Sequence, residues 1–339
     1  MRFRLISILP AALMLAFLVP SCKEEETTKE YMNGSLNVEH DMPLYVRPYE
    51  SYTFTPSGIT APDGTDVGYY FTSPITSAKD TLKNGRTSFK YTVPDSLGTF
   101  TLSCAAYPVQ SGDKYYITSV TMTFAIVSDD PEHGSITGVS RSAGDTEVDI
   151  DERIYYARKS GNYTWLRSNL SYVLRDTDGN ETFGHSFRDS EAMQNIFGAY
   201  YTWEEAQTAC PAGWHLPSDA EWVDLLKSVG ASSDLKPLQA SPSGAGKLMA
   251  KARFNGSLMW DYYREVNITD EALGAIPTGY ANVSDGEYAF AGYLDYAVFW
   301  TADEYEGNGV YRYINKQYDN VFVGTASKQT FAASVRCVR

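Results

Sequence analysis

Few side chains in this sequence have the types and spacing that catalysis or metal binding requires. His185 and His215 lie about 30 residues apart without an obvious third ligand, and His133 has no partner at metal-ligand spacing. The sequence contains no nucleophile elbow, no phosphate-binding loop and no His-x-x-x-His motif. We therefore expect no catalytic residue, no metal site, no cofactor and no enzymatic activity.

One run of oxygen-bearing side chains could suit calcium, namely Asp176-Thr177-Asp178-Gly179-Asn180-Glu181. It lacks the rest of an EF-hand loop and contains Asp-Gly, which favours a tight hairpin turn. The sequence therefore predicts a turn at this position.

The cysteines point to lipid attachment and to disulfide chemistry. An apolar run of about 15 residues from Leu5 to Val19 is too short to cross a bilayer core and fits a signal peptide. It ends in Leu18-Val19-Pro20-Ser21-Cys22, which resembles the bacterial lipobox. We expect residues 1–21 to be removed and Cys22 to carry lipid such as palmitate; the alternative is an ordinary signal peptide with a chance cysteine.

The segment after Cys22 indicates where the protein is displayed. Lys23-Glu24-Glu25-Glu26 resembles the surface-export signal of Bacteroidetes lipoproteins, although a solvated tether is the alternative. Residues 22–32 are polar and are expected to be flexible. No later stretch is apolar enough to cross a membrane, so we expect an outer-membrane lipoprotein exposed on the cell surface and attached through lipid only.

The charge balance excludes nucleic acid as a partner. Removing residues 1–21 deletes Arg2 and Arg4, so basic residues fall from 28 to 26 against 42 acidic ones, and the net charge moves from −14 to −16 (26 − 42). Proteins bind nucleic acid largely by neutralising phosphates with Lys and Arg, which this balance does not favour.

Residues 33–127 predict an all-β domain. Short runs of alternating, β-branched and aromatic residues are separated by turn signals such as Asn84-Gly85. Several short strands at this spacing are typical of an immunoglobulin-like sandwich. The piece from Pro94 to Leu102 resembles the late strands of bacterial immunoglobulin-like and PKD-like modules.

Three cysteines besides Cys22 cannot all pair within the chain: Cys104, Cys210 and Cys337. Cys104 alternates with Phe100 and Leu102, so it is expected on the inward face of a strand. The simplest interpretation is a buried free thiol that packs as a small hydrophobic group.

A polar segment rich in turn residues predicts a linker at residues 128–145. Beyond it, Thr202 and Glu205 form a predicted capping box that begins a short helix with Trp203 and Cys210 on one face. A second capping box at Ser218-Asp219-Ala220-Glu221 precedes a helix with one buried stripe, which Gly230 is placed to close.

The run from Tyr201 to Leu226 closely resembles the Fibrobacter succinogenes major paralogous domain. Four further pieces resemble this family in the same order: Asn162 to Tyr172, Gly274 to Tyr280, Val298 to Ala302, and Ala333 to Arg339. The resemblance assigns residues 146–339 to one domain. The predicted fold class is therefore an immunoglobulin/PKD-like all-β sandwich followed by an α+β C-type lectin-like domain, because the family looks like a member of that superfamily.

The resemblance implies a disulfide between the helix cysteine Cys210 and the last-strand cysteine Cys337, which leaves Cys104 free. The calcium-dependent sugar motifs of lectins, Glu-Pro-Asn, Gln-Pro-Asp and Trp-Asn-Asp, are absent from the sequence. The run from Trp214 to Trp222 also resembles an element of the formylglycine-generating-enzyme fold. An enzyme of that fold is an alternative that the lack of spare cysteines and histidines disfavours.

Aromatic and acidic side chains between about Gly256 and Tyr305 are the predicted ligand contacts, because loops on a rigid scaffold often carry recognition. Aromatic faces beside carboxylates suit a sugar ring or a protein hot spot. The alternatives are core packing for Trp260 and a solvated hairpin face for the later residues. The candidates are Trp260, Asp261, Tyr262, Tyr263, Tyr288, Tyr293, Asp295 and Tyr305.

Two tripeptides, Asp80-Thr81-Leu82 and Asp95-Ser96-Leu97, resemble the Bacteroidetes O-glycosylation pattern and make Thr81 and Ser96 candidate acceptors. The leading functional hypothesis is a surface-displayed binding or adhesion lipoprotein whose lectin-like domain presents loops to a glycan or protein ligand. A structural subunit of a surface assembly is the alternative.

Overall fold

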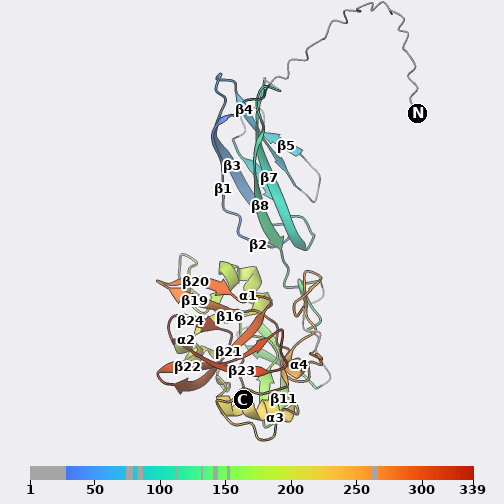
Figure 1. Ribbon diagram of the computed structural model, residues 1–339, viewed down its shortest axis with the longest axis vertical. Helices are drawn as coiled ribbons and strands as arrows, with labels where there is room; N and C mark the ends of the chain where they lie inside the picture. Colours follow the sequence, from blue (N-terminus) through green and yellow to red (C-terminus); the bar gives the residue numbers. More distant parts are fainter. Residues whose placement is uncertain are drawn as a thin grey trace, which may run out of the picture.

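The computed structural model shows a chain built mainly from β-strands, arranged in two groups along the long axis of the molecule (Figure 1). Strands β1 to β8 form the upper group in this view, and all later elements form the lower group. The structure describes residues 28–73, 79–82, 87–110, 113–130, 133–139, 144–150, 153–261 and 266–339. Cys22 and the signal peptide lie outside these residues.

The upper group consists of two sheets. One has the order β1-β3-β6 and the other the order β2-β8-β7-β4-β5, with antiparallel pairing except between β2 and β8. The strands are β1 (Asn33–His40), β2 (Tyr45–Val46), β3 (Ser51–Thr60), β4 (Val67–Thr72), β5 (Lys79–Leu82), β6 (Phe89–Thr92), β7 (Gly98–Pro108) and β8 (Thr118–Ile126).

Inward-facing apolar side chains alternate with outward-facing ones along the strands and form a core between these two sheets. Phe89 on β6 stacks on Phe71 of β4 with ring centroids 4.4 Å apart, and Leu102 and Cys104 on β7 are fully buried in the same cluster. Cys104 is a free, buried cysteine, as predicted. Burial raises the pKa of its thiol to about 12, because a thiolate in an apolar core loses its hydration.

The lower group contains short helices around several small sheets. Its helices are η1 (Phe187–Asp189), α1 (Glu191–Phe197), α2 (Trp203–Ala209), α3 (Asp219–Ser228) and α4 (Ala245–Leu248). Both predicted capping boxes are confirmed at the starts of α2 and α3, and Gly230 adopts a φ of +85° just after α3. In the part of the chain that the structure describes, no helix is long and apolar enough to span a membrane.

The strands of the lower group are short and mostly antiparallel. Their sheets have the orders β10-β11-β12, β13-β14, β15-β16-β24-β19-β20, β18-β17-β9 and β21-β22-β23. The strands are β9 (Ile136–Thr137), β10 (Thr146–Ile150), β11 (Arg153–Ser160), β12 (Tyr163–Leu166), β13 (Leu174–Arg175), β14 (Glu181–Phe183), β15 (His185–Ser186), β16 (Ala199–Thr202), β17 (Arg253–Phe254), β18 (Ser257–Leu258), β19 (Tyr280–Ser284), β20 (Glu287–Ala291), β21 (Tyr296–Tyr305), β22 (Asn308–Asn315), β23 (Val321–Ala326) and β24 (Phe331–Ala333).

The calcium-like run from Asp176 to Glu181 forms the turn between β13 and β14, as predicted. The Asp176 carboxylate accepts hydrogen bonds from the backbone amides of Asp178 and Asn180, and the Gly179 amide donates to the Asp176 carbonyl. The carboxylate and carbonyl oxygens of Asp176 therefore stabilise the turn by accepting its backbone hydrogen bonds.

The segment predicted as a linker is packed against the lower group over much of its described length. Strand β9 pairs with β17, and the fully buried side chain of Asp145 forms an ion pair with Arg158 at 2.7 Å. Tyr45 of the upper group packs against Phe187 of the lower group, with ring centroids 5.8 Å apart. Direct contacts therefore join the two groups.

The predicted disulfide is confirmed: Cys210 at the end of α2 is bonded to Cys337, 127 residues later. This bond ties α2 to the C-terminal segment, whose Val338 bridges to Trp165 and to His215. It therefore fixes a helix to a segment that lies more than 120 residues later in the chain.

Replacing both Cys210 and Cys337 by Ala should lower the free energy of unfolding by about 2–4 kcal/mol, because the bond restricts a long loop in the unfolded chain. Tryptophan fluorescence during urea unfolding measures this, since all six tryptophans lie between residues 165 and 300. In a variant without Cys22, Cys104 should react with a thiol reagent only after unfolding. Rapid labelling of the folded protein would contradict its burial.

Candidate functional site

The structure corrects the prediction for Trp260. Its side chain is only 1% exposed, and its indole N–H donates a hydrogen bond of 2.9 Å to the Ala275 carbonyl. It packs in the largest apolar cluster of the lower group, with Trp222 and Leu248. Trp260 is therefore a core residue and offers no surface to a ligand. Core packing is the alternative that the sequence leaves open for Trp260.

The acidic candidates Asp261 and Asp295 lie together, because both contact one lysine. The Lys316 ammonium is 3.2 Å from Asp261 and 2.7 Å from Asp295, so much of their charge is balanced within the protein. The neighbouring candidates Tyr262 and Tyr263 lie outside the described residues.

The remaining tyrosine candidates do not form one cluster. Tyr288 on β20 stacks on His185 with ring centroids 3.7 Å apart, whereas Tyr293 packs against Phe187 and Phe197 beside the upper group. Tyr305 lies at the far end of β21 and is 50% exposed. The predicted aromatic and acidic residues therefore lie in three places: Asp261 and Asp295 at Lys316, Tyr288 and Tyr293 against one apolar cluster, and Tyr305 at the far end of β21.

The two candidate acceptors for O-glycans lie in the upper group. Thr81 is on β5, where its backbone pairs with Tyr70, and Ser96 lies half-buried in the turn between β6 and β7. Glycosylation at either position stays a prediction.

The structure shows a surface that the sequence interpretation missed, a row of partly exposed aromatic rings across the outer face of β22 and its neighbours. Consecutive ring centroids lie 5.1, 5.3, 5.8, 4.9 and 6.0 Å apart. In order, this aromatic row is Tyr280, Phe331, Tyr311, Tyr313, Phe322 and Tyr318. Tyr318, at its end, is 51% exposed.

Strand register explains why Tyr311, Tyr313 and Phe322 share one face of the sheet β21-β22-β23. Tyr311 and Tyr313 alternate along β22 with buried residues, and Tyr313 lies directly opposite Phe322 of β23. Tyr311 lies opposite Gly324, and a Cβ on Gly324 would come within 2.4 Å of the Tyr311 ring. Because Gly324 has no side chain, the Tyr311 ring can lie against the backbone of the neighbouring strand.

The row combines apolar rings with polar groups that are available to a ligand. No phenol hydroxyl of Tyr280, Tyr311, Tyr313 or Tyr318 makes a hydrogen bond to another residue within the described part of the chain. Partial burial, followed by the neighbouring phenols, raises the pKa of Tyr311 and of Tyr313, so both hydroxyls are neutral at physiological pH. Exposed Asn282 follows Tyr280 along the same face of β19.

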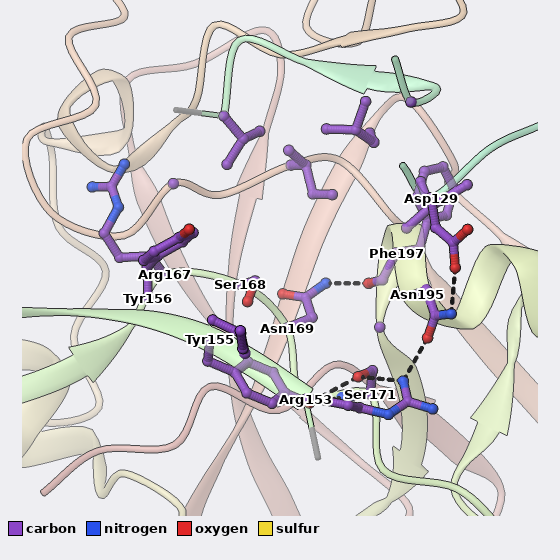
Figure 2. A pocket seen from close by; sticks show the side chains of 18 of the residues that line it. Asp129, Arg153, Tyr155, Tyr156, Arg167, Ser168, Asn169, Ser171, Asn195 and Phe197 are labelled. Atoms are coloured by element: carbon purple, nitrogen blue, oxygen red, sulfur yellow. Dashed lines mark hydrogen bonds between the residues drawn. The ribbon is translucent and has the colours of Figure 1, made fainter. Parts of the chain in front are cut away.

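A cavity lies elsewhere, between the 128–139 segment and β11 (Figure 2). Its volume is about 680 Å³. The Arg153 guanidinium donates to the Ser171 hydroxyl and to Asn195, and Asn195 in turn donates to Asp129 (Figure 2). These side chains bond to one another and link the 128–139 segment to α1, so we assign them a structural role.

Arg336 lies in the wall of this cavity and is fully buried. It donates to Asn169 Oδ1 at 2.8 Å and to the carbonyls of Leu166, Leu273 and Gly274, and no carboxylate of the described residues forms an ion pair with it. Burial, and then the nearby Arg167, lower the pKa of Arg336 to about 9, so the guanidinium is still charged at neutral pH.

The groups around Arg336 and the aromatic row differ in whether they are available to bind a ligand. The groups around Arg336 hold loops together, whereas the rings of the aromatic row are partly exposed and its phenol hydroxyls make no hydrogen bond to another described residue. Across the described residues, no group of three or more His, Cys, Asp or Glu side chains could hold a metal ion. The aromatic row is therefore the best candidate for a binding site.

Comparison with known proteins identifies one family. The model of the Fibrobacter succinogenes major domain matches residues 159–339, and the match begins later than the start predicted from the sequence at residue 146. No curated protein matches the chain.

Replacing Arg336 by Met should lower the free energy of unfolding by about 3–5 kcal/mol, because three buried carbonyls and Asn169 would lose their donor. Arg153→Met is the matched control and should cost roughly 1 kcal/mol, because Arg153 is partly exposed and has neutral partners. Tryptophan fluorescence in urea compares the two. Equal losses would show that Arg336 does not hold the loops together.

Proposed function

The chain belongs to the Fibrobacter succinogenes major domain family, and from this premise we propose that it is a surface-displayed binding lipoprotein whose family domain holds a glycan on the aromatic row. The observation that carries this proposal is the row itself: six partly exposed rings, none more than 6.0 Å from the next, which span two neighbouring sheets and the connection between β22 and β23.

A sugar chain suits this surface physically. The C–H faces of a pyranose ring pack on aromatic rings, and the hydroxyls around the sugar need hydrogen-bonding partners at the edges of those rings. The unbonded phenols of Tyr311 and Tyr313 and the amide of Asn282 can supply such partners. Because the row carries no charged side chain, a neutral glycan is favoured over an acidic one.

Two structural observations support the finer fold assignments that we propose for the chain. The bond between Cys210 and Cys337 joins α2 to the C-terminal segment, which is the arrangement expected of a C-type lectin-like domain. In the upper group, two sheets face each other across one apolar core, as they would in an immunoglobulin- or PKD-like sandwich. In this proposal, the sandwich is a spacer.

The location rests on the sequence. The lipobox-like end of the apolar run supports lipid on Cys22, and the acidic cluster Glu24-Glu25-Glu26 supports display on the outer surface of the outer membrane. A binding protein placed there would meet glycans of the surroundings or of neighbouring cells.

Other ligands and roles make different predictions for the aromatic row. A protein ligand could use the same rings as a hot spot, and a structural subunit would need both groups of sheets for assembly. Turnover of a bound compound would indicate an enzyme. A neutral-glycan array, probed with the mature protein, separates these roles because only the proposed one predicts retention of glycans without turnover.

Tyr318→Ala should weaken glycan binding about three- to tenfold, because an aromatic contact at a binding surface contributes on the order of 1 kcal/mol. Tyr305→Ala is the matched control, since Tyr305 is equally exposed but lies off the row. Both variants should keep the melting temperature within a degree or two. Titration calorimetry with an array-positive glycan measures the affinities.

Gly324→Ala gives an independent check on the same site, because its Cβ would displace the Tyr311 ring. Equal affinities in Tyr318→Ala, Gly324→Ala and the unaltered protein would place the binding surface elsewhere. Failure of the unaltered protein to retain any glycan would reject the proposed function.

Lipidation at Cys22 should be visible by metabolic labelling with a fatty-acid probe in a bacterial host. The unaltered protein should be labelled and sediment with membranes, and Cys22→Ala should be unlabelled because the thiol that accepts lipid is gone. Ser21→Ala keeps the cysteine and is the control. Equal labelling of Cys22→Ala would show that lipid, if present, is attached at another residue.

A further inference from the structure

Four apolar side chains are exposed together at the outer end of the upper group. Tyr31 is 76% exposed, Val109 51%, Tyr116 45% and Ile117 56%, and the rings of Tyr31 and Tyr116 contact each other with centroids 4.9 Å apart. We call these four residues the apolar tip. Exposed apolar side chains that cluster at one place mark an interaction surface more often than scattered ones do.

The apolar tip lies at the opposite end of the upper group from the junction with the family domain. Strands β7 and β8 run the length of this group, and the residues just after β8 pack on the lower group. The connection between β7 and β8, which carries Val109, Tyr116 and Ile117, is therefore at the far end (Figure 1).

Backbone hydrogen bonds fix the start of the described chain to this same end. The Glu30 amide donates to the Lys114 carbonyl and the Tyr116 amide donates to the Glu30 carbonyl, both at 2.9 Å. Glu30 follows Cys22 by eight positions, and an extended chain spans at most about 3.5 Å per position, or about 28 Å in all. Lipid on Cys22 would thus hold the apolar tip close to a bilayer surface.

We propose that the apolar tip rests on the lipid surface to which Cys22 is attached. Tyrosine suits the boundary between headgroups and acyl chains because its ring is apolar and its hydroxyl is polar. Ile117 and Val109 add apolar contact. The contact is weak on its own, but a short tether raises the local concentration of the tip at the membrane and keeps the contact populated.

The charges around the tip indicate that apolar contact, and not electrostatic attraction, holds it on the membrane. The Lys29 ammonium pairs with Asp113 at 3.4 Å and that of Lys114 with Asp63 at 2.8 Å, while Glu30 is exposed. No excess of positive charge is left to attract anionic lipid. The contact should therefore form on zwitterionic lipid and should resist salt.

A resting tip would set the orientation of the whole molecule. With this end on the membrane, the long axis points away from the surface and the family domain, with its aromatic row, projects outward (Figure 1). This inference rests on the proposed attachment at Cys22, although the experiment below replaces lipidation with an artificial tether.

The experiment uses the mature chain with a hexahistidine tag in place of Cys22, bound to phosphatidylcholine vesicles that contain nickel-chelating lipid. An environment-sensitive fluorophore is placed on Gln110→Cys at the tip or on Ser233→Cys after α3, both of which are exposed positions. The buried Cys104 does not compete for the label. Quenching by lipids that carry a quencher near the headgroup should be about threefold stronger at position 110, because only the tip reaches headgroup depth.

The triple variant Tyr31→Ser, Tyr116→Ser, Ile117→Ser should reduce quenching at position 110 to the level at position 233. Its matched control, Leu238→Ser with Leu258→Ser, removes exposed apolar side chains elsewhere and should leave the quenching unchanged. Equal quenching at both positions, or quenching that the triple variant retains, would overturn the proposal, as would its loss in about 0.5 M salt. Dimers of the free protein that the triple variant abolishes would assign the tip to a second copy instead.

Discussion

The lower group depends on one buried cation and the amide beside it. Arg336 bonds Asn169, and the Asn169 side-chain amide donates to the Phe197 carbonyl and to the hydroxyls of Thr278 and Ser334. These residues are far apart in the sequence, yet they meet in one hydrogen-bonded network. A buried guanidinium without a carboxylate is costly unless its donors are satisfied, so the surrounding loops must close in one arrangement. The neighbouring Cys337 then fixes that arrangement to α2.

Local chemistry made much of the scaffold predictable from the sequence. The capping boxes at Thr202 and Ser218 depend on residues three positions apart, so the sequence alone predicts where these two helices begin. The hairpin turn at Asp176 and the inward position of Cys104 follow from equally short spacings. The pairing of Cys210 with Cys337 depended on family resemblance, because three cysteines allow more than one pairing.

The candidate site could not be predicted in the same way, because its members meet only after the chain folds. Trp260 lies in an irregular region without a repeating apolar pattern, and long-range packing with α3 and α4 buries it. The aromatic row draws rings from β19, β22, β23 and β24, and only the register of the sheet places Tyr313 beside Phe322. The one local signal was the alternation of Tyr311 and Tyr313 with buried residues along β22.

The network around Arg336 and the aromatic row differ in how far they lie within the sequence pieces that resemble the family. The sequence pieces that resemble the family supply Asn169, Thr278, Ser334 and Arg336, all of which are buried in the network around Arg336. Most of the aromatic row lies outside those pieces: of its six residues, only Tyr280 belongs to one of them. The pieces that carry the resemblance therefore include the buried network, whereas most of the partly exposed rings lie between those pieces. If the row binds a ligand, the identity of that ligand depends on side chains that can change without disturbing the buried network, and ligand preference can then differ between chains that share the same scaffold.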